Sequence, residues 1–514
     1  MKKLMITLIV AGMMATSFAA TPPATSFANG AGTENAPYEI SSVAELLFMR
    51  DMTNDSEDVA NYRTAHYVLT ANLDMASEND WIPIANTASF QGKFDGNGHE
   101  IKNLKYGASS SYSSAAGNYV GFIGWVKYGS ISNLKIVDAA FYATVTSGDY
   151  FLGGVVGYLQ TGLVNNCSFS GMLISNQPNS AICYIGGIIG RINSPNEVQS
   201  AVVVNCTSTG TISGNFIGDT PSNMLVGGIV GHSAGSTSTT FNTKIVNCYS
   251  SMNVSAVSTS GAIYAGGLVG QFATGTSITA RLLNSYASGN VYGKTTGNTY
   301  VGGIVGRQNS ATSATSYCIA LNNSVKLEKN SDCFRVASLN NGVLSNNFAL
   351  GSDVMILQKM NSSLVWINVV VTSNAAGAHG ETLAGETVVD QISGALAKLN
   401  AYVTANPTVD DISLKSWEIK SGNDFPVFQT SITTIKNSVQ DFVDYKIMSR
   451  ENGIEIYSPA LSKAVIYNTN GQILNQINTN NERAFAELSE KGLVVVVGYD
   501  LQGRKLFAHK HVVK

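Results

Sequence analysis

The chain has 514 residues, of which 13% are charged and 44% are hydrophobic, and its net charge is −3. About a quarter of the residues of an average globular protein are charged. This composition excludes a disordered chain, which combines low hydrophobicity with high charge, and it disfavours a mainly helical protein, whose exposed faces carry Glu and Lys. No nucleic-acid partner is expected, because binding one requires a clustered basic surface.

Residues 1–20 are expected to form a signal peptide. The start, Met1–Lys3, is basic, Leu4 to Met14 is apolar, and residues 17–19 form a small-x-small cleavage site. The apolar run is too short for a membrane anchor, and no later run of about 18 apolar residues predicts a transmembrane segment. We therefore expect an exported protein, extracellular or on the outer-membrane surface, with residues 21–36 as a linker.

A seven-residue pattern recurs six times in the middle of the chain. The copies read YVGFIGW, FLGGVVG, YIGGIIG, LVGGIVG, YAGGLVG and YVGGIVG and begin at residues 119, 151, 184, 225, 264 and 300. Their β-branched and aromatic residues favour strands, and paired glycines allow close approach of two backbones. The glycines expected to be structural are Gly153, Gly154, Gly186, Gly187, Gly227, Gly228, Gly266, Gly267, Gly302 and Gly303.

A second element follows the heptad in each repeat. It reads LVNNCSFSG, VVVNCTSTG, KIVNCYSSM and RLLNSYASG, beginning at residues 163, 202, 244 and 281. Side chains that recur once per repeat stack when the repeats stack, and amide side chains hydrogen-bond along such a stack. We therefore expect an asparagine ladder of Asn166, Asn205, Asn247, Asn284 and Asn323.

The repeats predict an all-β solenoid. A unit of 32–41 residues cannot bury its apolar side alone, whereas stacked units share a continuous core. The pattern indicates a parallel β-helix with about one coil per repeat. A β-propeller fits less well, because each blade needs four strands joined by hairpin turns, and each unit here holds two or three strand-like runs.

The heptad followed by I-x-N-C/S-Y-A resembles the GLUG repeat of bacterial surface proteins. The stretch from Tyr38 to Ile101, in which Ser42 and Glu45 form a helix capping box, is similar to the coil that precedes such repeats. The resemblance implies a right-handed parallel β-helix, with an N-terminal cap and first coil at 37–115 and the repeats at 116–350. In the first copy, Phe122 stands where the other copies have their second glycine.

Two further regions follow the repeats. Residues 351–430 are expected to cap the solenoid, because an open end would expose unpaired strand edges. Residues 431–514 predict a separate small β-sandwich, with turn signals at 470–471 and 502–503. The order of its motifs resembles the C-terminal sorting domain of type IX secretion in Bacteroidetes, which implies export machinery as a partner. A plain β-sandwich without that role is the alternative.

The repeat region is poor in groups that could catalyse a reaction. A glycosidase needs two carboxylates about 5–10 Å apart, but between Asp149 and Glu328 the only acids are Glu197 and Asp219, at different coil positions. A lyase needs a base and a cation, yet the basic residues are scattered, although Arg191 and Arg307 share the place just after the heptad. Asp95 and Asn97 fit a turn better than a calcium site. No catalytic residue, metal or cofactor is predicted.

The six cysteines fit a structural role. They are Cys167, Cys183, Cys206, Cys248, Cys318 and Cys333. Three directly follow a ladder asparagine, and Ser285 and Ser324 take the same place in later copies, which indicates a slot for a small side chain. Buried thiols are the first interpretation, while disulfides, which export would permit, and a metal site stay open.

Two classes of function remain. The first is a secreted or cell-surface, adhesin-like interaction protein that presents polar loops on a β-helix to a glycan or a host surface protein. The second is a carbohydrate-active enzyme, a polysaccharide lyase or glycosidase, on the same scaffold. The scarcity of acidic residues favours the first class.

Overall fold

The computed structural model describes residues 21–513 with short gaps. The gaps are residues 56, 58–61, 79, 115–116, 145–146, 178–181, 194–199, 219–221, 235–241, 275–278, 353, 372–376, 420–424, 429–445, 451, 458–460, 469–471, 480–482, 489–491 and 500–504. The expected signal peptide therefore lies outside the described residues. The chain divides into two compact units, Met1–Val427 and Phe428–Lys514, which are treated separately below.

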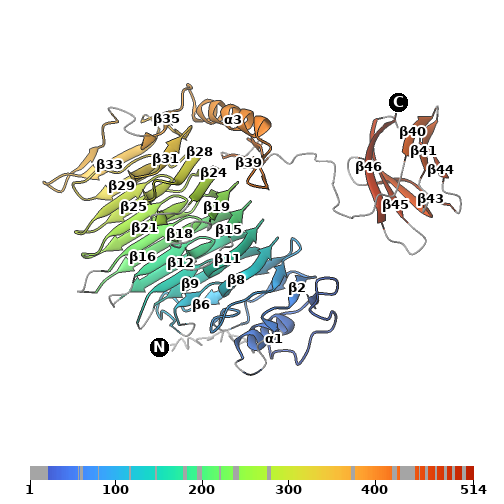
Figure 1. The fold of residues 1–514 in the computed structure, drawn as a ribbon, viewed down its shortest axis with the longest axis horizontal. Coiled ribbons are helices and arrows are strands. Elements are labelled where there is room, and N and C mark those ends of the chain that lie inside the picture. Colours follow the sequence, from blue (N-terminus) through green and yellow to red (C-terminus); the bar gives the residue numbers. More distant parts are fainter. Residues whose placement is uncertain are drawn as a thin grey trace, which may run out of the picture. The chain divides into compact units, whose positions relative to one another are not determined.

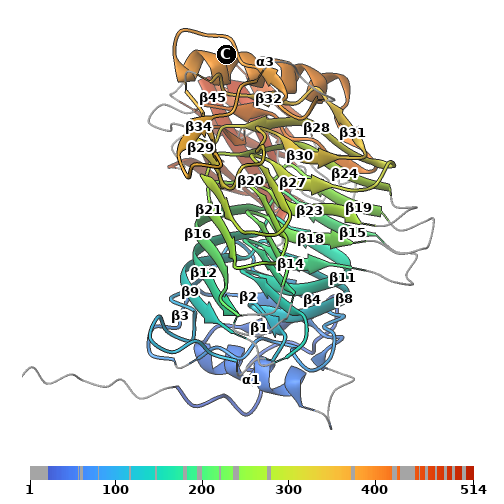
Figure 2. The same ribbon diagram turned by 90° about the vertical axis from the view of Figure 1, so that its left-hand side faces the viewer.

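The first unit is a parallel β-solenoid, in which the strands of successive coils lie side by side (Figures 1 and 2). The first half of each heptad forms one strand of a six-stranded parallel sheet. These strands are β7 (Tyr119–Val120), β10 (Tyr150–Gly153), β13 (Cys183–Gly186), β17 (Met224–Gly227), β22 (Ile263–Gly266) and β26 (Thr299–Gly302). The predicted right-handed parallel β-helix is confirmed.

The remaining strands of the coils belong to a larger sheet that continues around the solenoid. The strands after the glycine turn are β8 (Ile123–Ser132), β11 (Val156–Asn165), β14 (Ile189–Ile192), β18 (Val230–Ala234), β23 (Val269–Thr274), β27 (Val305–Gln308) and β30 (Ala337–Asn340). The strands that lead into the asparagine turn are β15 (Ala201–Val204), β19 (Asn242–Val246), β24 (Thr279–Ala287), β28 (Ser313–Ala320) and β31 (Val343–Ser345), with the second halves of β8 and β11.

A third group of strands closes each coil and leads to the next heptad. These strands are β9 (Lys135–Ala143), β12 (Ser168–Gln177), β16 (Thr207–Phe216), β20 (Tyr249–Ser250), β21 (Asn253–Ser258), β25 (Val291–Lys294), β29 (Ser324–Glu328) and β32 (Phe348–Ala349). The core inside the coils is almost wholly apolar, and most of its side chains are less than 3% exposed. The same positions are buried in successive coils.

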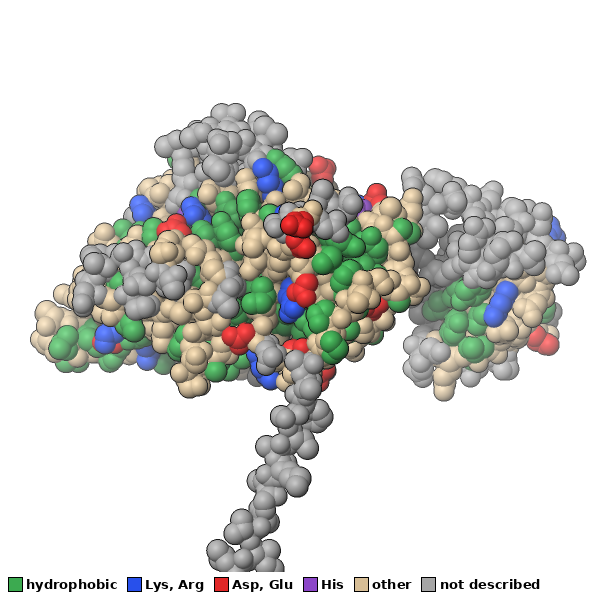
Figure 3. All heavy atoms as spheres, turned by 90° about the horizontal axis from the view of Figure 1, so that it is seen from below, with side chains coloured by type: hydrophobic (Ala, Val, Ile, Leu, Met, Phe, Trp, Pro, Cys, Tyr) green, Lys and Arg blue, Asp and Glu red, His purple; other side chains and the backbone are tan. Residues whose placement is uncertain are grey.

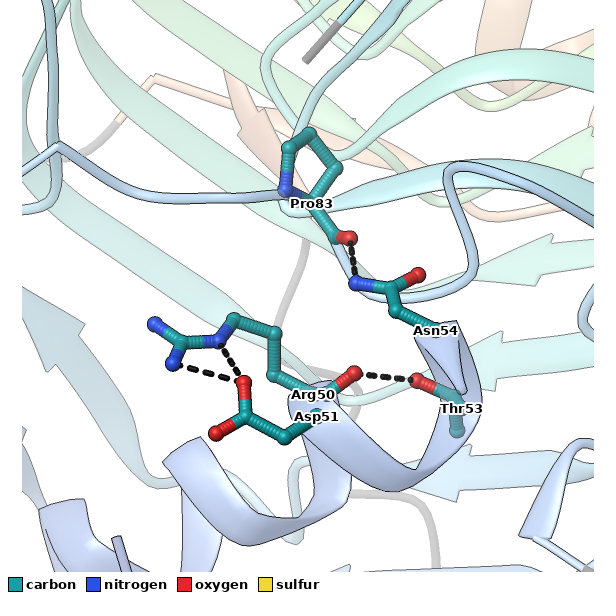
Figure 4. A network of polar contacts seen from close by, with 5 residues as sticks. All are labelled: Arg50, Asp51, Thr53, Asn54 and Pro83. Carbon is teal, nitrogen blue, oxygen red and sulfur yellow. Dashed lines mark hydrogen bonds and ion pairs between the residues drawn. The ribbon is translucent and has the colours of Figure 1, made fainter. Parts of the chain in front are cut away.

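Helix α1 (Val43–Asn54) covers the N-terminal end of the stack, next to strands β1 (Tyr38–Ile40), β2 (His66–Leu69), β3 (Leu73–Asp74), β4 (Lys93–Asp95), β5 (Glu100–Lys102) and β6 (Lys105–Tyr106) (Figure 1). The Ser42 hydroxyl accepts a hydrogen bond from the Glu45 N–H at 3.3 Å, as the sequence predicts. At the other end of the helix, the Asn54 amide donates to the Pro83 carbonyl at 2.8 Å (Figure 4). Both ends of α1 are thus fixed.

The C-terminal end of the stack is covered by helix α3 (Val388–Ala405), which begins with a capping box at Thr387 (Figure 1). An antiparallel hairpin, β33 (Ile356–Met360) and β34 (Trp366–Asn368), and the short strand β35 (Glu381–Thr382) precede the helix. After it come β36 (Thr408–Val409), β37 (Ile412–Ser413), β38 (Trp417–Glu418) and β39 (Val427–Phe428). This segment turns back along the outside of the coils, as described below.

The second unit consists of two antiparallel sheets around one apolar core. One sheet contains β40 (Lys446–Arg450), β41 (Gly453–Tyr457) and β44 (Arg483–Glu487), and the other contains β42 (Lys463–Tyr467), β43 (Ile473–Asn478), β45 (Gly492–Tyr499) and β46 (Lys505–Val513). Both sheets contribute side chains to that core, among them Ile456 and Ile466. This arrangement matches the expected small β-sandwich.

Charged side chains are sparse and scattered on the face drawn in Figure 3. Within the described part of the chain, no helix has both the length and the hydrophobicity needed to cross a bilayer.

Candidate binding surfaces

The paired glycines mark places where neighbouring backbones touch. At all ten predicted positions, an added Cβ would lie within 2.3 Å of a backbone oxygen. At Gly228, for example, it would lie 2.1 Å from the Gly267 carbonyl oxygen and 2.2 Å from the Ser250 hydroxyl. Real Cβ atoms do not approach so closely, so the glycines make the tight turn of each coil possible.

The first heptad is one residue shorter than the others. The register pairs Tyr119 with Phe151 and Ile123 with Val156. The interpretation that Phe122 replaces the second glycine is therefore wrong, because that glycine is missing and Phe122 occupies a core position instead. Its fully buried ring stacks on Trp81 with centroids 5.5 Å apart.

The aromatic side chains at the first position of the heptads stack into a column. Tyr119, Phe151 and Tyr184 stack with centroids 5.3 Å apart, and Tyr264 stacks on Tyr300 at 4.9 Å. Phe151 and Tyr184 are only 7% and 4% exposed, so this column mainly holds the coils together. Each stacked pair adds about 0.5–1.5 kcal/mol beyond burial.

Arg191 is the charged centre of this column. Its guanidinium lies 4.6 Å from the ring centroid of Tyr184 and 3.6 Å from the Asp149 carboxylate. Burial raises the pKa of Tyr184, and burial together with the charge of Arg191 lowers the pKa of His232 well below its usual value. At neutral pH both groups are therefore uncharged, and Arg191 and Asp149 form an ion pair.

The acids that were weighed as a catalytic pair, Glu197 and Asp219, lie outside the described residues. Within the described part of the chain, no three His, Cys, Asp or Glu side chains are grouped as metal ligands. Asp95 and Asn97 form a turn, in which the Asp95 carboxylate accepts the Asn97 N–H at 2.8 Å and the amide of Asn133 at 2.9 Å.

The six cysteines are buried and carry free thiols. Cys167, Cys206 and Cys248 follow ladder asparagines, and the register places Ser285 and then Cys318 next in the same column. The expectation that Ser324 occupies this slot is wrong, since β28 has already filled it with Cys318. Thiol groups of this column donate to backbone carbonyl oxygens of their own coil, as Cys206 does to Val204 at 3.2 Å.

The asparagine ladder lies where each coil turns between two strands. Asn166, Asn205, Asn247 and Asn284 all have left-handed backbones, with φ between 49° and 57°. The amide of Asn284 donates to Oδ1 of Asn247 at 2.9 Å, and the amide of Asn247 donates to Oδ1 of Asn205 at 3.0 Å. Asn is one of the few residues besides glycine that adopts this conformation readily.

Two details of the ladder differ from the expectation. The amide of Asn205 donates to Asn165 at 2.9 Å, and Asn166 donates instead to Asn133 at 2.8 Å. Asn323 does not belong to the ladder. The register places Tyr317, with φ of 51°, above Asn284, and Asn323 comes only at the start of the next strand.

The ladder binds a segment from far along the chain. Residues 412–418, which we call the strap, run along the turns from the coil of Asn247 to that of Asn284. Asn247 donates to the Ser413 carbonyl at 2.9 Å and accepts the Lys415 N–H at 3.2 Å, while Asn284 donates to the Lys415 carbonyl at 2.8 Å. No pattern in the sequence predicted the contact between the strap and the ladder.

An open groove of about 570 Å³ lies on the same side of the first coils. Its lining residues are His66, Gln91, Gly92, Lys93, Tyr128, Gly129, Ser130, Gly162, Leu163, Ser200 and Val202. Tyr128 is 42% exposed, and Lys127 lies 5.0 Å from the centroid of its ring. The groove thus combines an exposed aromatic ring with several uncharged hydrogen-bonding groups, and we call it the Tyr128 groove.

Tyr128 has an unusual backbone. Its φ is +64°, in the left-handed region. Here Tyr128 and Gly129 stand opposite the single residue Gly162 of the next coil, which makes a β-bulge. A bulky residue in this conformation costs about 1–3 kcal/mol, and such strain is concentrated at functional sites. The bulge turns the ring into the groove.

No family model matches the chain. An alignment over 176 residues, which covers 32% of this chain, is 31% identical to halomucin of Haloquadratum walsbyi and spans 2% of that protein. A crystal structure of a Bacteroides ovatus protein provisionally named an immunoglobulin A1 protease is similar over 78% of this chain and 95% of that one, with 23% identity and a TM-score of 0.47.

Proposed function

We propose that this chain is an exported surface protein that binds a glycan in the Tyr128 groove. The observation that carries the proposal is the exposed Tyr128 ring, held by a strained bulge in a groove lined by amide, imidazole and hydroxyl groups and by Lys93, which pairs with Glu34. Binding sites for small molecules combine apolar and aromatic surfaces with a few placed polar groups. One face of a sugar ring is apolar and its rim carries hydroxyls, which matches this combination.

The proposed role at a cell surface is supported only by the fold and by a partial sequence similarity, and by no particular site. The chain forms a stiff, regular solenoid of low charge, and it shares sequence similarity with a part of halomucin, a protein named as a mucin. The GLUG-type repeat and export through the C-terminal unit belong to the same proposal. Deleting residues 492–513, which form β45 and β46, should leave the protein in the periplasm if the unit acts in sorting.

The experiment is a glycan-array screen with the full-length protein and the variant Tyr128→Gly. Glycine accepts the positive φ, so this variant removes the ring and relieves backbone strain. We expect it to lose binding while its melting temperature stays the same or rises. Tyr128→Phe keeps the ring and should retain most of the binding. Binding by wild type and Tyr128→Gly alike would refute the groove as the glycan site.

Two further readouts test the class of function. Because the groove binds through hydrogen bonds and an aromatic face, affinity should change little between low and high salt, in contrast to ion-pair binding. The second readout is the release of new reducing ends or unsaturated products from bound polysaccharides. Product release that disappears in Glu197→Gln or Asp219→Asn would identify the chain as a carbohydrate-active enzyme and refute the binding-protein proposal.

A further inference from the structure

We propose that the part of the asparagine ladder left uncovered by the strap binds an extended peptide of a partner protein, as the covered part binds the strap. This site adjoins the Tyr128 groove, because Leu163 and Val202 belong to both. It depends on Asn166 and Asn205, whereas the groove depends on Tyr128.

The strap shows what the ladder recognises. Asn247 contacts the main chain of the strap, at the Ser413 carbonyl and the Lys415 N–H. Asn284 contacts the Lys415 carbonyl and also accepts a hydrogen bond from the Trp417 indole. Leu414, between these residues, packs into a row formed by Val204, Val246 and Leu283. Main-chain hydrogen bonds combined with apolar contacts from alternate side chains are how proteins bind extended peptides. The ladder advances one coil for every two residues of the strap.

The ladder asparagines continue towards the N-terminal coils, where Asn165 takes the place that Val204 has in the apolar row. Asn205 and Asn166 have φ values of 57° and 54°, against 53° and 49° for Asn247 and Asn284. The two covered asparagines are fully buried, whereas Asn205 is half-buried and Asn166 is exposed. An amide nitrogen carries two hydrogens. The Asn247 amide donates one of its hydrogens to the ladder and the other to the strap. The Asn205 amide donates one hydrogen to Asn165.

The row that receives Leu414 continues as Asn165 in the next uncovered coil. A second row, two residues earlier on each strand, indicates the composition of the peptide. Under the strap it contains Lys244 and Arg281, which contact Asp410, and Arg281 lies 3.3 Å from the Asp410 carboxylate. In the uncovered coils the register places Leu163 and Val202 in this row. The partner segment should therefore be extended, and the residue that lies against Leu163 and Val202, as Asp410 lies against Lys244 and Arg281, should be apolar. Charged residues at that point would meet no counter-ion in the row.

The probe is a fluorescent, end-blocked peptide with the sequence of residues 412–418, ISLKSWE, added to the full-length protein and followed by anisotropy. We expect saturable binding that Asn205→Gly or Asn166→Gly weakens by about tenfold, the effect of losing one or two main-chain hydrogen bonds. Glycine keeps the left-handed backbone in both variants. Because Asn166 is exposed, its variant should fold even if Asn205→Gly does not.

The matched control is Asn346→Gly, an exposed asparagine with φ of 53° in the coil beyond Tyr317. It should bind the peptide as the wild type does, and so should Tyr128→Gly, which separates this site from the glycan groove. A peptide N-methylated at the position of Lys415 should not bind. Equal affinity in the Asn205 and Asn166 variants, or a loss in Asn284→Gly but not in these two, would mean displacement of the strap and overturn the proposal.

Discussion

The indole N–H of Trp417 donates a hydrogen bond to Oδ1 of Asn284 at 2.9 Å, across 133 residues of chain. Asn284 is the last asparagine of the ladder, and the next coil has Tyr317 in its place. Trp417 therefore supplies the donor that a further asparagine would have supplied. Its ring also packs edge-on against Tyr286, with centroids 5.2 Å apart. The strap thus ends the ladder and joins the C-terminal cap to the coils.

The first prediction concerns this contact. Trp417→Phe keeps an aromatic ring but leaves Oδ1 of Asn284 buried without its donor. An unsatisfied buried acceptor costs about 1–3 kcal/mol, and we expect a loss of that size in the free energy of unfolding, measured in urea. Trp366→Phe, at an indole that is 37% exposed, is the control and should change the free energy by less than about 0.5 kcal/mol. Equal effects would show that the contact with Asn284 contributes nothing.

The second prediction compares one substitution at two glycines. Gly228→Ala places a methyl group 2.1 Å from a backbone oxygen and should destabilise the solenoid by about 1–3 kcal/mol or more, as overpacking does. Gly394→Ala lies on the exposed side of α3, where the nearest atom is 4.0 Å away. There the helix should gain about 0.5–1 kcal/mol. Thermal unfolding of both variants gives the signs, and a stabilised Gly228→Ala would contradict the turn geometry.

The heptads and most of the ladder could be predicted from the sequence, because a stacked coil repeats a residue wherever its environment repeats. The same reasoning failed at Asn323. The motif Asn322-Asn323-Ser324 looks like another copy, but the register aligns Cys318 with Ser285, six residues earlier. The spacing between asparagine and heptad varies from coil to coil, and only the backbone pairing decides which asparagine stacks.

The two binding surfaces could not be predicted in this way. The strap contacts residues more than 130 positions away, and nothing in its sequence matches the repeat. The Tyr128 groove depends on a bulge, which exists only because two residues of one coil face one residue of the next. Repetition in a sequence shows which residues the coils share, but it does not show which distant segment covers them or where one coil contains a bulge.

The third prediction concerns the thiols. Burial raises the pKa of Cys183, Cys318 and Cys333 to about 12, and the thiolate is the reactive form of cysteine. The folded protein should therefore react negligibly with a thiol reagent such as DTNB at pH 8. After unfolding in guanidinium without reductant, all six cysteines should react. A count of four or two would reveal disulfides and contradict the buried-thiol interpretation.

The last prediction is a loss of stability in mild acid. Burial, assisted by the charge of Arg335, lowers the pKa of His379 from 6.5 to about 4. Between these values the unfolded chain holds a proton that the folded chain does not, so acid favours unfolding. The contribution of His379 is complete above pH 6.5 and is lost as the pH falls towards 4. His232, whose pKa burial also lowers, acts in the same direction.

Melting temperatures at pH 7, 6, 5 and 4 measure this effect. His379→Gln cannot take up a proton, so its melting temperature should fall less steeply with acidification than that of the wild type. His99→Gln, at a half-exposed side chain 3.2 Å from the Asn72 amide oxygen, is the matched control and should keep the wild-type slope. His379→Gln with an unchanged slope would mean that His379 is protonated in the folded protein at pH 5. Its 6% exposure and its position beside the Phe334 ring, with centroids 5.0 Å apart, argue for the neutral form.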